Sequence, residues 1–506
     1  MSGKTQENIA TNDALATVNE EPSPPIPASH PDLGRDSLPE PGRRNFLKAT
    51  TLGAGAVALG AVASPFISRA EAEQLTPRQI PLPGLPTRPE KAAHWYVPAN
   101  DQTVHWGYFS KSLKPLLEMN SGDYATIECL THQAGDDPER MIKDDPGAES
   151  VYYWTKDKKN VNRRGAGPMN APNGAGGGAG VHIMTGPIAI NGAKEGDILE
   201  VRVLDMYPRP CANPEFKGKA FGTNISAWWG YQYNDYLENP KPREVVTIYE
   251  LQADGSTDWA VAVHSYRWGP FTDPFGVVHK IYDYPGLVVN PNDYHPKTGI
   301  MKNVRVPLRP HFGVIGVTPK EVDIVTSIPP DLFGGNVDDW RFGKGATLYY
   351  PILIDGALFS VGDTHAAMGD SELNGTAIES SWTGVFQFIV HKQSDIAKGT
   401  LLADLNWPLL ETKDEWVVHG FSFPQYLAQL GPDAQTEVFK KATVDLAMRD
   451  AFRKMRSFLM NTQNLSEDEA LSLMSVAVDF GVTQVVDGNW GVHASVKKRI
   501  FAGAAV

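Results

Sequence analysis

Short alternating apolar runs between residues 103 and 390 constrain the fold of this chain most strongly. Examples are residues 124–130, 198–204, 245–251 and 384–390, in which apolar side chains recur at every second position. These runs carry many β-branched and aromatic residues, and glycine, proline, asparagine and aspartate separate them. Such a pattern is typical of strands that bury one face. We therefore expect a mainly β fold, either a sandwich or a barrel.

Composition and charge narrow the possible classes of protein. The 506 residues include 47 glycines and 39 prolines, which favour turns and short strands and exclude an all-α fold. The formal net charge of −13, without a basic stripe, excludes nucleic-acid binding. Two cysteines, Cys129 and Cys211, are too few for a cysteine zinc cage or an iron–sulfur centre. Whether they form a disulfide stays open at this point.

The last hundred residues carry a helical pattern instead. Within residues 432–460, mostly apolar side chains recur every three or four residues, as on one face of a helix. This stripe consists of Val438, Ala442, Leu446, Arg449, Phe452, Met455 and Leu459. Ser466 and Glu469 have the spacing of a capping box, which predicts a second helix over residues 470–480, ended by Gly481. We expect the helices of this chain to be concentrated near its C-terminus.

The first 72 residues have the features of an export signal. Residues 1–42 are rich in proline and acidic side chains and cannot bury a core, so we expect disorder there. Arg43 and Arg44 precede a mildly apolar run that ends at Ala70 and Ala72, a small-x-small cleavage pattern. This combination predicts a twin-arginine signal peptide, the twin-arginine translocase as a transient partner, and a periplasmic or secreted protein. The run is too diluted by glycine and alanine for a stable membrane anchor.

These patterns predict the organisation of the remaining chain. Residues 73–94 are rich in proline and polar side chains, which is typical of a linker or arm. Residues 95–405 are expected to form one β-rich body. Residues 406–506 are expected to form an α+β region that completes the same fold.

Polar residues that interrupt a buried strand face mark the strongest candidate site. Asp363 and His365 continue the apolar face that ends at Val361, and Asp370 and Glu372 follow over a short turn. One imidazole and three carboxylates suit a hard or borderline divalent cation. The same groups could instead carry out general acid–base chemistry without a metal.

Other candidates are single polar or glycine residues near predicted strands. Asp205 extends the inward face of residues 199–203, so it must be paired, bound to a metal or placed at the solvated end of its strand. A single polar residue is more often structural than functional. The further candidates are Glu128, His132, His182, Gly334, Gly335 and Asn336.

Several segments, in this order along the chain, resemble the acetamidase/formamidase family. The segment of residues 362–370, Gly-Asp-Thr-His-Ala-Ala-Met-Gly-Asp, is the most specific of them. The resemblance extends from about His105 to residues 475–480. The segments that carry it are residues 186–197, 310–319, 334–338, 356–370 and 375–379.

The resemblance implies a β-rich fold with a sandwich-like core and the hydrolysis of small aliphatic amides to a carboxylate and ammonia. It also implies a homo-oligomer and a bound zinc or calcium ion, with no nucleotide cofactor. By position, the family's active-site run corresponds to Asp363, His365, Asp370 and Glu372, with Glu128, Asp205 and Asn336 as neighbours.

Roles for these residues follow from the chemistry of amide hydrolysis, which needs an activated water, a stabilised oxyanion and a proton for ammonia. We expect Glu372, or alternatively Glu128, to carry the proton. His132, Gly334 and Gly335 are expected in substrate-contacting loops. The cation is expected to be held by some of Asp205, His182, Asp363, His365 and Asp370.

Two departures and two alternatives remain. Residues 138–164 and 266–303 look like insertions, which commonly remodel substrate access. One alternative is a non-catalytic periplasmic protein that binds a sugar or osmolyte through the aromatic stretch around Trp228 and Trp229. The other is a redox enzyme, although no nucleotide or haem motif supports it.

Overall fold

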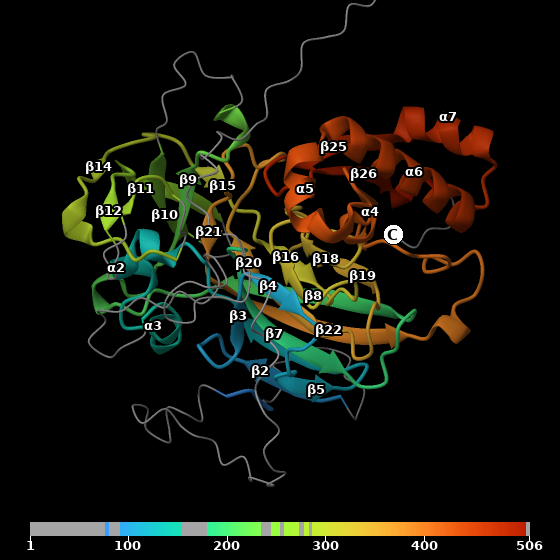
Figure 1. Ribbon diagram of the computed structural model, residues 1–506, viewed down its shortest axis with the longest axis horizontal. Coiled ribbons are helices and arrows are strands. Elements are labelled where there is room, and N and C mark those ends of the chain that lie inside the picture. The colour runs from blue at the N-terminus through green and yellow to red at the C-terminus, as the bar shows by residue number, and fades with distance from the viewer. Residues whose placement is uncertain are drawn as a thin grey trace, which may run out of the picture. The chain divides into compact units, whose positions relative to one another are not determined.

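A computed structural model of the protein shows the expected mainly β architecture, with strands in two large sheets and helices gathered near the C-terminus (Figure 1). The proposed signal residues Arg43, Arg44, Ala70 and Ala72 lie outside the described residues. The structure describes residues 76–79, 92–153, 180–233, 244–252, 258–272, 278–282 and 286–501.

Within these residues, ten strands form the first sheet, in the order β1-β2-β6-β22-β8-β19-β23-β24-β26-β25. All neighbours are antiparallel except β2 and β6. Three of the strands expected from the sequence, β6, β8 and β22, lie side by side in this sheet. The bounds are β1 Arg78–Gln79, β2 His94–Val97, β6 Tyr124–Glu128, β22 Trp382–His391, β8 Ile198–Pro208, β19 Thr347–Pro351, β23 Leu409–Glu411, β24 Glu415–Phe421, β26 Gly491–Lys497 and β25 Val478–Gln484.

Among the described residues, twelve strands form the second sheet, which carries the candidate site. Its main order is β14-β11-β10-β9-β21-β20-β16-β18. Strand β7 joins it beside β20 and also pairs with β3 and β5, and β15 pairs with β11. The bounds are β14 Lys297–Thr298, β11 Trp259–Arg267, β10 Val245–Gln252, β9 Ala220–Ser226, β21 Glu379–Ser380, β20 Phe359–His365, β16 His311–Gly316, β18 Gly334–Asn336, β7 Ile183–Ile190, β3 Val104–Trp106, β5 Leu117–Met119 and β15 Val306–Pro307.

Two short antiparallel pairs complete the described strands: β12 Phe271–Thr272 with β13 Val278–His279, and β17 Ile324–Thr326 with β4 Tyr108–Ser110.

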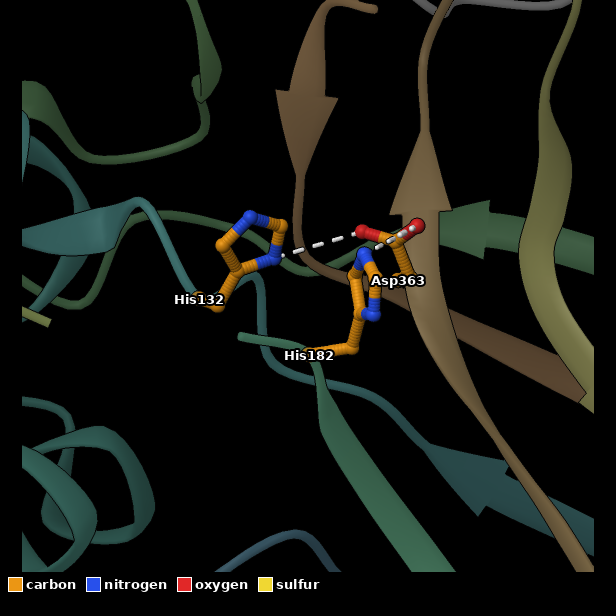
Figure 2. A group of neighbouring side chains, drawn as sticks. All are labelled: His132, His182 and Asp363. Atoms are coloured by element: carbon orange, nitrogen blue, oxygen red, sulfur yellow. Dashed lines mark ion pairs between the residues drawn. The ribbon is translucent and has the colours of Figure 1, made fainter. Parts of the chain in front are cut away.

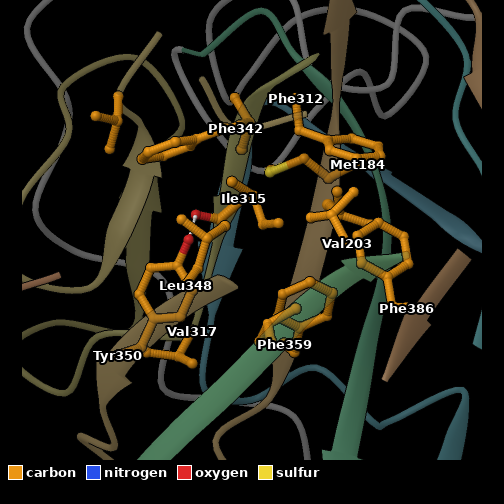
Figure 3. Packing of buried hydrophobic residues seen from close by; sticks show 14 of the residues in the cluster. Met184, Val203, Phe312, Ile315, Val317, Phe342, Leu348, Tyr350, Phe359 and Phe386 are labelled. Atoms are coloured by element: carbon orange, nitrogen blue, oxygen red, sulfur yellow. Dashed lines mark hydrogen bonds between the residues drawn. The ribbon is translucent and has the colours of Figure 1, made fainter. Parts of the chain in front are cut away.

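The largest core lies between the two sheets (Figure 3). Val203 on β8 and Phe386 on β22 come from the first sheet, and Phe312 on β16 and Phe359 on β20 come from the second. The rings of Phe312 and Phe386 have centroids 5.0 Å apart, so side chains of the two sheets interdigitate. This is the packing of a β-sandwich. The expectation of a sandwich-like mainly β fold is thus confirmed.

A bulge in β8 explains where Asp205 lies. Opposite β22, the pairing shifts by one residue between Val203 and Asp205, so Leu204 is the extra residue. Beyond a bulge the alternation of inward and outward side chains changes phase. Met206 therefore continues the buried face, and Asp205 turns outward to an ion pair with Lys344 (2.7 Å).

The helices near the C-terminus differ in detail from the predicted pattern. The predicted single helix over 432–460 is two helices, because the chain is extended at Ala442 and Thr443, and the Thr443 side chain caps the second helix. Phe452, expected on the buried face, is 38% exposed. The α-helices of the described residues are α2 Pro138–Met141, α3 Pro146–Tyr152, α4 Tyr426–Gln429, α5 Ala434–Lys441, α6 Val444–Gln463 and α7 Glu467–Ala477.

Helix α6 packs on β24 and β26 through a face that is rotated from the predicted one and shares only Met455 and Leu459 with it. Close approach requires Gly420 on β24, because a Cβ there would lie 2.0 Å from the backbone nitrogen of Ala451. The buried residues on this face of α6 are Ala447, Ala451, Met455, Phe458 and Leu459.

None of the described helices is both long and apolar enough to span a membrane.

The predicted capping box at Ser466 and Glu469 is present and opens α7. The predicted end of that helix at Gly481 is wrong, since the helix stops at Ala477 and Gly481 lies within β25. The β-branched residues of β25 pair with β26, and this pairing outweighs the helical pattern. Both cysteines are free thiols, Cys129 buried and Cys211 partly buried.

Candidate functional site

A row of polar side chains crosses four neighbouring strands of the second sheet. His311 on β16 lies opposite His365 on β20, His365 lies opposite Glu379 on β21, and Glu379 lies opposite Thr223 on β9. Paired residues on adjacent strands share one face of a sheet. Asp363, two residues before His365, lies on the same face of β20. Sheet pairing thus gathers residues that are distant in the sequence.

Two further histidines, His132 and His182, lie beside Asp363 and do not belong to this row of strand residues (Figure 2). His132 follows β6, and its Nδ1 atom lies 3.3 Å from Asp363 Oδ1. His182 directly precedes β7, the strand beside β20, and its Nε2 atom lies 3.6 Å from Asp363 Oδ2. Ser327 Oγ bonds His182 Nδ1 at 2.8 Å, which leaves Nε2 directed at Asp363. One atom from each of the three side chains can reach a common ion.

A second group of acids adjoins this triad. Nε2 of His365 lies 3.3 Å from both Asp363 Oδ2 and Glu379 Oε1. Its Nδ1 atom lies 3.8 Å from Asp338 Oδ1, and Glu372 also belongs to this group. The groups Asp363–His365–Glu379 and Asp338–His365–Glu372 each bring three possible ligand atoms together.

The orientation of the His365 ring is set by His311. The Nδ1 atom of His311 lies 2.6 Å from the carbonyl oxygen of Arg309 and must donate to it. The Nε2 atom of His311 then accepts from Nδ1 of His365, 3.0 Å away. Burial lowers the pKa of His311 to about 3, with the nearby His365 adding to this effect, so its ring is neutral. The Nε2 atom of His365 is therefore the nitrogen presented to Asp363 and Glu379.

Three of the clustered carboxylates sit on left-handed backbone. The φ angles are 52° at Asp338, 50° at Asp363 and 48° at Glu372. Such angles are uncommon for residues other than glycine and persist where the surroundings enforce them. Strained residues of this kind concentrate at functional sites. The backbone thus supports a functional assignment independently of the side-chain chemistry.

The cluster buries more negative charge than its neighbours compensate. Five carboxylates, none more than 7% exposed, lie in or next to it. Among the described residues none of them forms an ion pair with lysine or arginine, and histidine nitrogens lie close to Asp338, Asp363 and Glu379. Buried charge of this density requires a bound cation, protons or both. The five are Asp338, Asp363, Glu372, Glu379 and Asp487.

The pKa values divide the cluster into charged and protonated groups. Burial alone would raise the pKa of Asp363, but the adjacent His182 and His365 outweigh it and hold this carboxyl well below its usual range. Burial lowers the pKa of His182 to about 4, so its imidazole is neutral. Burial and the neighbouring Asp338 raise the pKa of Glu372 well above its ordinary value. Asp363 is thus an anion, whereas Glu372 keeps its proton more readily.

The pKa values of the remaining acids, Asp338, Glu379 and Asp487, are also raised. Burial raises the pKa of Asp338 to about 7 and raises that of Glu379. The pKa of Asp487 is raised well above its usual range by burial and by the neighbouring Asp338, whose carboxyl shares a hydrogen bond with it. A bond between two carboxyl groups needs a proton on one of them.

The residues present fit a metal ion at the His132–His182–Asp363 group. His132 Nδ1 and Asp363 Oδ1 converge to 3.3 Å, yet neither has a hydrogen-bond partner among the described residues. Two imidazoles and a carboxylate are the donor set of catalytic zinc sites. Gly313 leaves room between Asp363 and the adjoining group of acids, because a Cβ there would lie 2.4 Å from Asp338 Oδ1 and 2.5 Å from Asp363 Oδ2.

Several residues proposed from the sequence lie elsewhere. The Glu128 carboxylate pairs with Arg209 (2.6 Å) and accepts from Tyr96, within a partly buried ion network. The Asp370 side chain is 46% exposed and accepts from Trp340 Nε1 at 2.8 Å. Asp205 faces outward, as described above. The structure therefore does not bring these three carboxylates into the cluster.

The β18 candidates have mixed placements. A Cβ on Gly334 would lie 2.5 Å from the Tyr350 ring, and one on Gly335 would lie 2.6 Å from the Phe333 ring. Both glycines have positive φ angles, so tight packing and backbone shape account for them. Asn336 is buried, and its Oδ1 atom has no hydrogen-bond partner among the described residues.

Four members of the cluster were not singled out individually from the sequence: Asp338, which ends the candidate stretch 334–338, and Glu379, His311 and Asp487. The first three lie inside segments that carry the family resemblance, at residues 334–338, 375–379 and 310–319. They follow or begin short apolar runs, and this position is the signal that could have marked them. Asp487 lies in a loop, and nothing in the local sequence distinguishes it.

Comparison with known proteins decides the family. The model of the acetamidase/formamidase family matches residues 179–324 and 322–502, most of the described chain. The chain belongs to this family. The residues matched by the family model include β20 and the loop that carries Glu372. The resemblance inferred from the sequence is confirmed.

Curated relatives of this acetamidase/formamidase family member match over part of their length. An acetamidase of Mycolicibacterium smegmatis is 29% identical over 213 residues, which cover 38% of this chain and 49% of the relative. A formamidase of Methylophilus methylotrophus is 22% identical over 215 residues, which cover 38% of this chain and 47% of the relative. The chain thus spans about half the length of these relatives.

Solved structures of the family share the fold. The acetamidase of Bacillus halodurans is 21% identical, with a TM-score of 0.52, covering 81% of this chain and 100% of that one. The acetamidase of Yersinia enterocolitica is 20% identical, with a TM-score of 0.52, covering 82% of this chain and 94% of that one.

A second family model concerns the N-terminal segment. The twin-arginine signal of the ubiquinol–cytochrome c reductase iron–sulfur subunit matches residues 35–72. This segment contains the paired arginines and the small-x-small motif identified from the sequence. The match indicates export by the twin-arginine route.

Proposed function

We propose that this chain hydrolyses the C–N bond of small linear amides such as formamide or acetamide, releasing a carboxylate and ammonia, with the help of a divalent cation. The observation that carries the proposal is the buried convergence of His132, His182 and Asp363 beside further buried acids. Family membership supports amide hydrolysis, and the export signal supports a periplasmic or secreted site of action. A homo-oligomer remains a prediction.

The cation would be held by His132, His182 and Asp363. A divalent cation bound there polarises the amide carbonyl and lowers the pKa of a bound water. Two nitrogen donors favour zinc over calcium, since calcium prefers an all-oxygen shell. Neutral His182 and anionic Asp363 are the protonation states that a ligand requires.

Glu372 would supply the proton that the leaving nitrogen needs. An amide nitrogen leaves only when it is protonated, so the reaction requires an acid that still carries a proton near neutral pH. The raised pKa of Glu372 meets this requirement. His365 would assist from the same cluster, because burial lowers its pKa but Glu379 and Asp363 outweigh this and raise it well above its usual range. Its positive charge would stabilise the developing oxyanion.

The Glu372→Gln variant tests the assignment of the acid. The amide side chain has nearly the shape of a protonated carboxyl group, so the fold should persist while proton donation is lost. We expect ammonia release from formamide or acetamide to fall by about 10²-fold or more. Glu437→Gln, at a partly exposed carboxylate of α5 that pairs with Lys440, is the matched control and should retain wild-type turnover. Undiminished turnover in Glu372→Gln would eliminate Glu372 as the acid.

A further inference from the structure

The loop that carries His132 is held by an unusually buried acid. Asp136 ends the 3-10 helix η2 (Ala134–Asp136), four residues after His132, and its side chain is fully buried. Its Oδ2 atom accepts from Thr223 Oγ1 at 2.8 Å, and its Oδ1 atom accepts from the Tyr282 hydroxyl at 2.9 Å. Its backbone oxygen accepts from the Tyr266 hydroxyl, also at 2.9 Å.

The segments that hold this loop are the two that look like insertions in the sequence. Tyr266 and Tyr282 belong to residues 266–303, and the same stretch provides Val289, whose backbone N–H donates to the Gly135 oxygen at 2.9 Å. Contact is so close that a Cβ on Gly135 would lie 2.2 Å from the Leu287 oxygen. The loop is therefore fixed on this side by direct backbone contact.

The other insertion holds the opposite end of the same loop. Tyr152 on α3 donates its hydroxyl hydrogen to the Thr131 oxygen at 2.6 Å and accepts from the backbone N–H of Ala134 at 3.1 Å. His132 thus lies between two anchored residues. Both segments that look like insertions thus hold the backbone on which a candidate cation ligand is mounted, and their effect on substrate access stays a prediction.

Thr223 joins this anchorage to the cluster itself. It lies opposite Glu379 in the pairing of β9 and β21, and its hydroxyl donates to Asp136. Among the described residues Asp136 forms no ion pair with lysine or arginine; its two carboxyl oxygens accept from hydroxyl groups, and burial still raises its pKa to about 7. A buried carboxyl group is costly when it is not paired with a charge. Through these bonds Asp136 links the loop of His132 to β9, the strand that pairs with β21 of the cluster.

We propose that Asp136, Thr223 and Tyr282 are positioning residues that fix His132 and thereby set the affinity of the centre for a divalent cation. The inference rests on the proposed function, because it takes His132 as one of the cation's ligands. Groups that orient a metal ligand typically account for about 10- to 100-fold in metal affinity. The three side chains contact neither the cation nor the substrate in this assignment.

Tyr282→Phe and Thr223→Val remove one hydroxyl each and keep the shape of the side chain, so both variants should fold. Zinc is titrated into the stripped full-length protein in competition with a chelating dye. We expect the dissociation constant for zinc to rise by about 10- to 100-fold in each variant. Tyr350→Phe is the matched control: it removes a buried hydroxyl that bonds the Ile315 oxygen, and it should leave zinc affinity unchanged.

Hydrogen exchange of the peptide covering residues 130–137 gives a second measurement that needs no cation. Exchange should be faster in Tyr282→Phe and Thr223→Val than in wild type or Tyr350→Phe. Wild-type zinc affinity and wild-type exchange in both variants would overturn the positioning role and leave the proposed centre intact. A wild-type protein that binds no zinc would instead contradict the centre, and the positioning role with it.

Discussion

Asp363→Asn should abolish cation binding and lower amide turnover by about 10³-fold or more. The Asp363 carboxylate belongs to two groups of possible ligands, His132–His182–Asp363 and Asp363–His365–Glu379. Its two oxygens face histidines on either side, at 3.3 Å for His132 and His365 and 3.6 Å for His182. An amide has no charge, and its NH₂ group would be directed at nitrogen ligands.

Asp363→Asn should remove the charged ligand without disturbing the fold. Asparagine tolerates the left-handed backbone that Asp363 adopts, with a φ of 50°, better than other residues except glycine. Circular dichroism should therefore match wild type, while zinc content and ammonia release are lost together. Asp355→Asn, at an exposed ion pair with Lys194, is the control that should change neither. An Asp363→Asn protein that still holds zinc and still releases ammonia would refute the proposed centre.

Gly313→Ala should inactivate the protein by filling the centre with a single methyl group. The new Cβ would lie 2.4 Å from Asp338 Oδ1, 2.5 Å from Asp363 Oδ2 and 2.7 Å from His365 Cε1. These distances are too short for contact, so the three side chains must move apart. We expect at least about a 10²-fold loss of kcat/KM, since small displacements of catalytic groups have effects of this size. Overpacking of this kind also costs about 1–3 kcal/mol of stability.

The matched control is Gly269→Ala, where a Cβ meets no atom within 4 Å. It should leave both the melting temperature and kcat/KM close to wild type. Zinc affinity measured on Gly313→Ala separates a displaced ligand from a blocked substrate. Full activity in Gly313→Ala would show that Asp338, Asp363 and His365 do not work together in the reaction.

Much of the fold could be predicted from the sequence because two-residue alternation is a local property. The runs at 124–130 and 384–390 became β6 and β22 with small changes at their ends. Asp205 shows where this reasoning fails, because a bulge in β8 reverses the side on which later residues lie. Only the pairing with β22 reveals the extra residue, and a single strand's sequence does not contain that information.

The residues of the candidate site likewise divide into those that local sequence identifies and those that only strand pairing brings into the site. Asp363 and His365 were found because they continue one strand's buried face. Glu379 and His311 join them through pairing with β21 and β16, which depends on contacts between distant segments. Glu128 was misleading, since a carboxylate at a strand end is equally suited to an ion pair, here with Arg209. Local sequence shows which residues can do chemistry, whereas sheet topology decides which of them meet.

The central claim is tested most directly by removing and restoring the cation. The purified, full-length protein is stripped with a chelator, and ammonia release from formamide and acetamide is measured as zinc is added back. We expect negligible release from the stripped protein and recovery that rises in proportion to bound zinc and ends at about one ion per chain. Ammonia release that survives complete stripping, or stripped protein that binds zinc without gaining turnover, would contradict this claim.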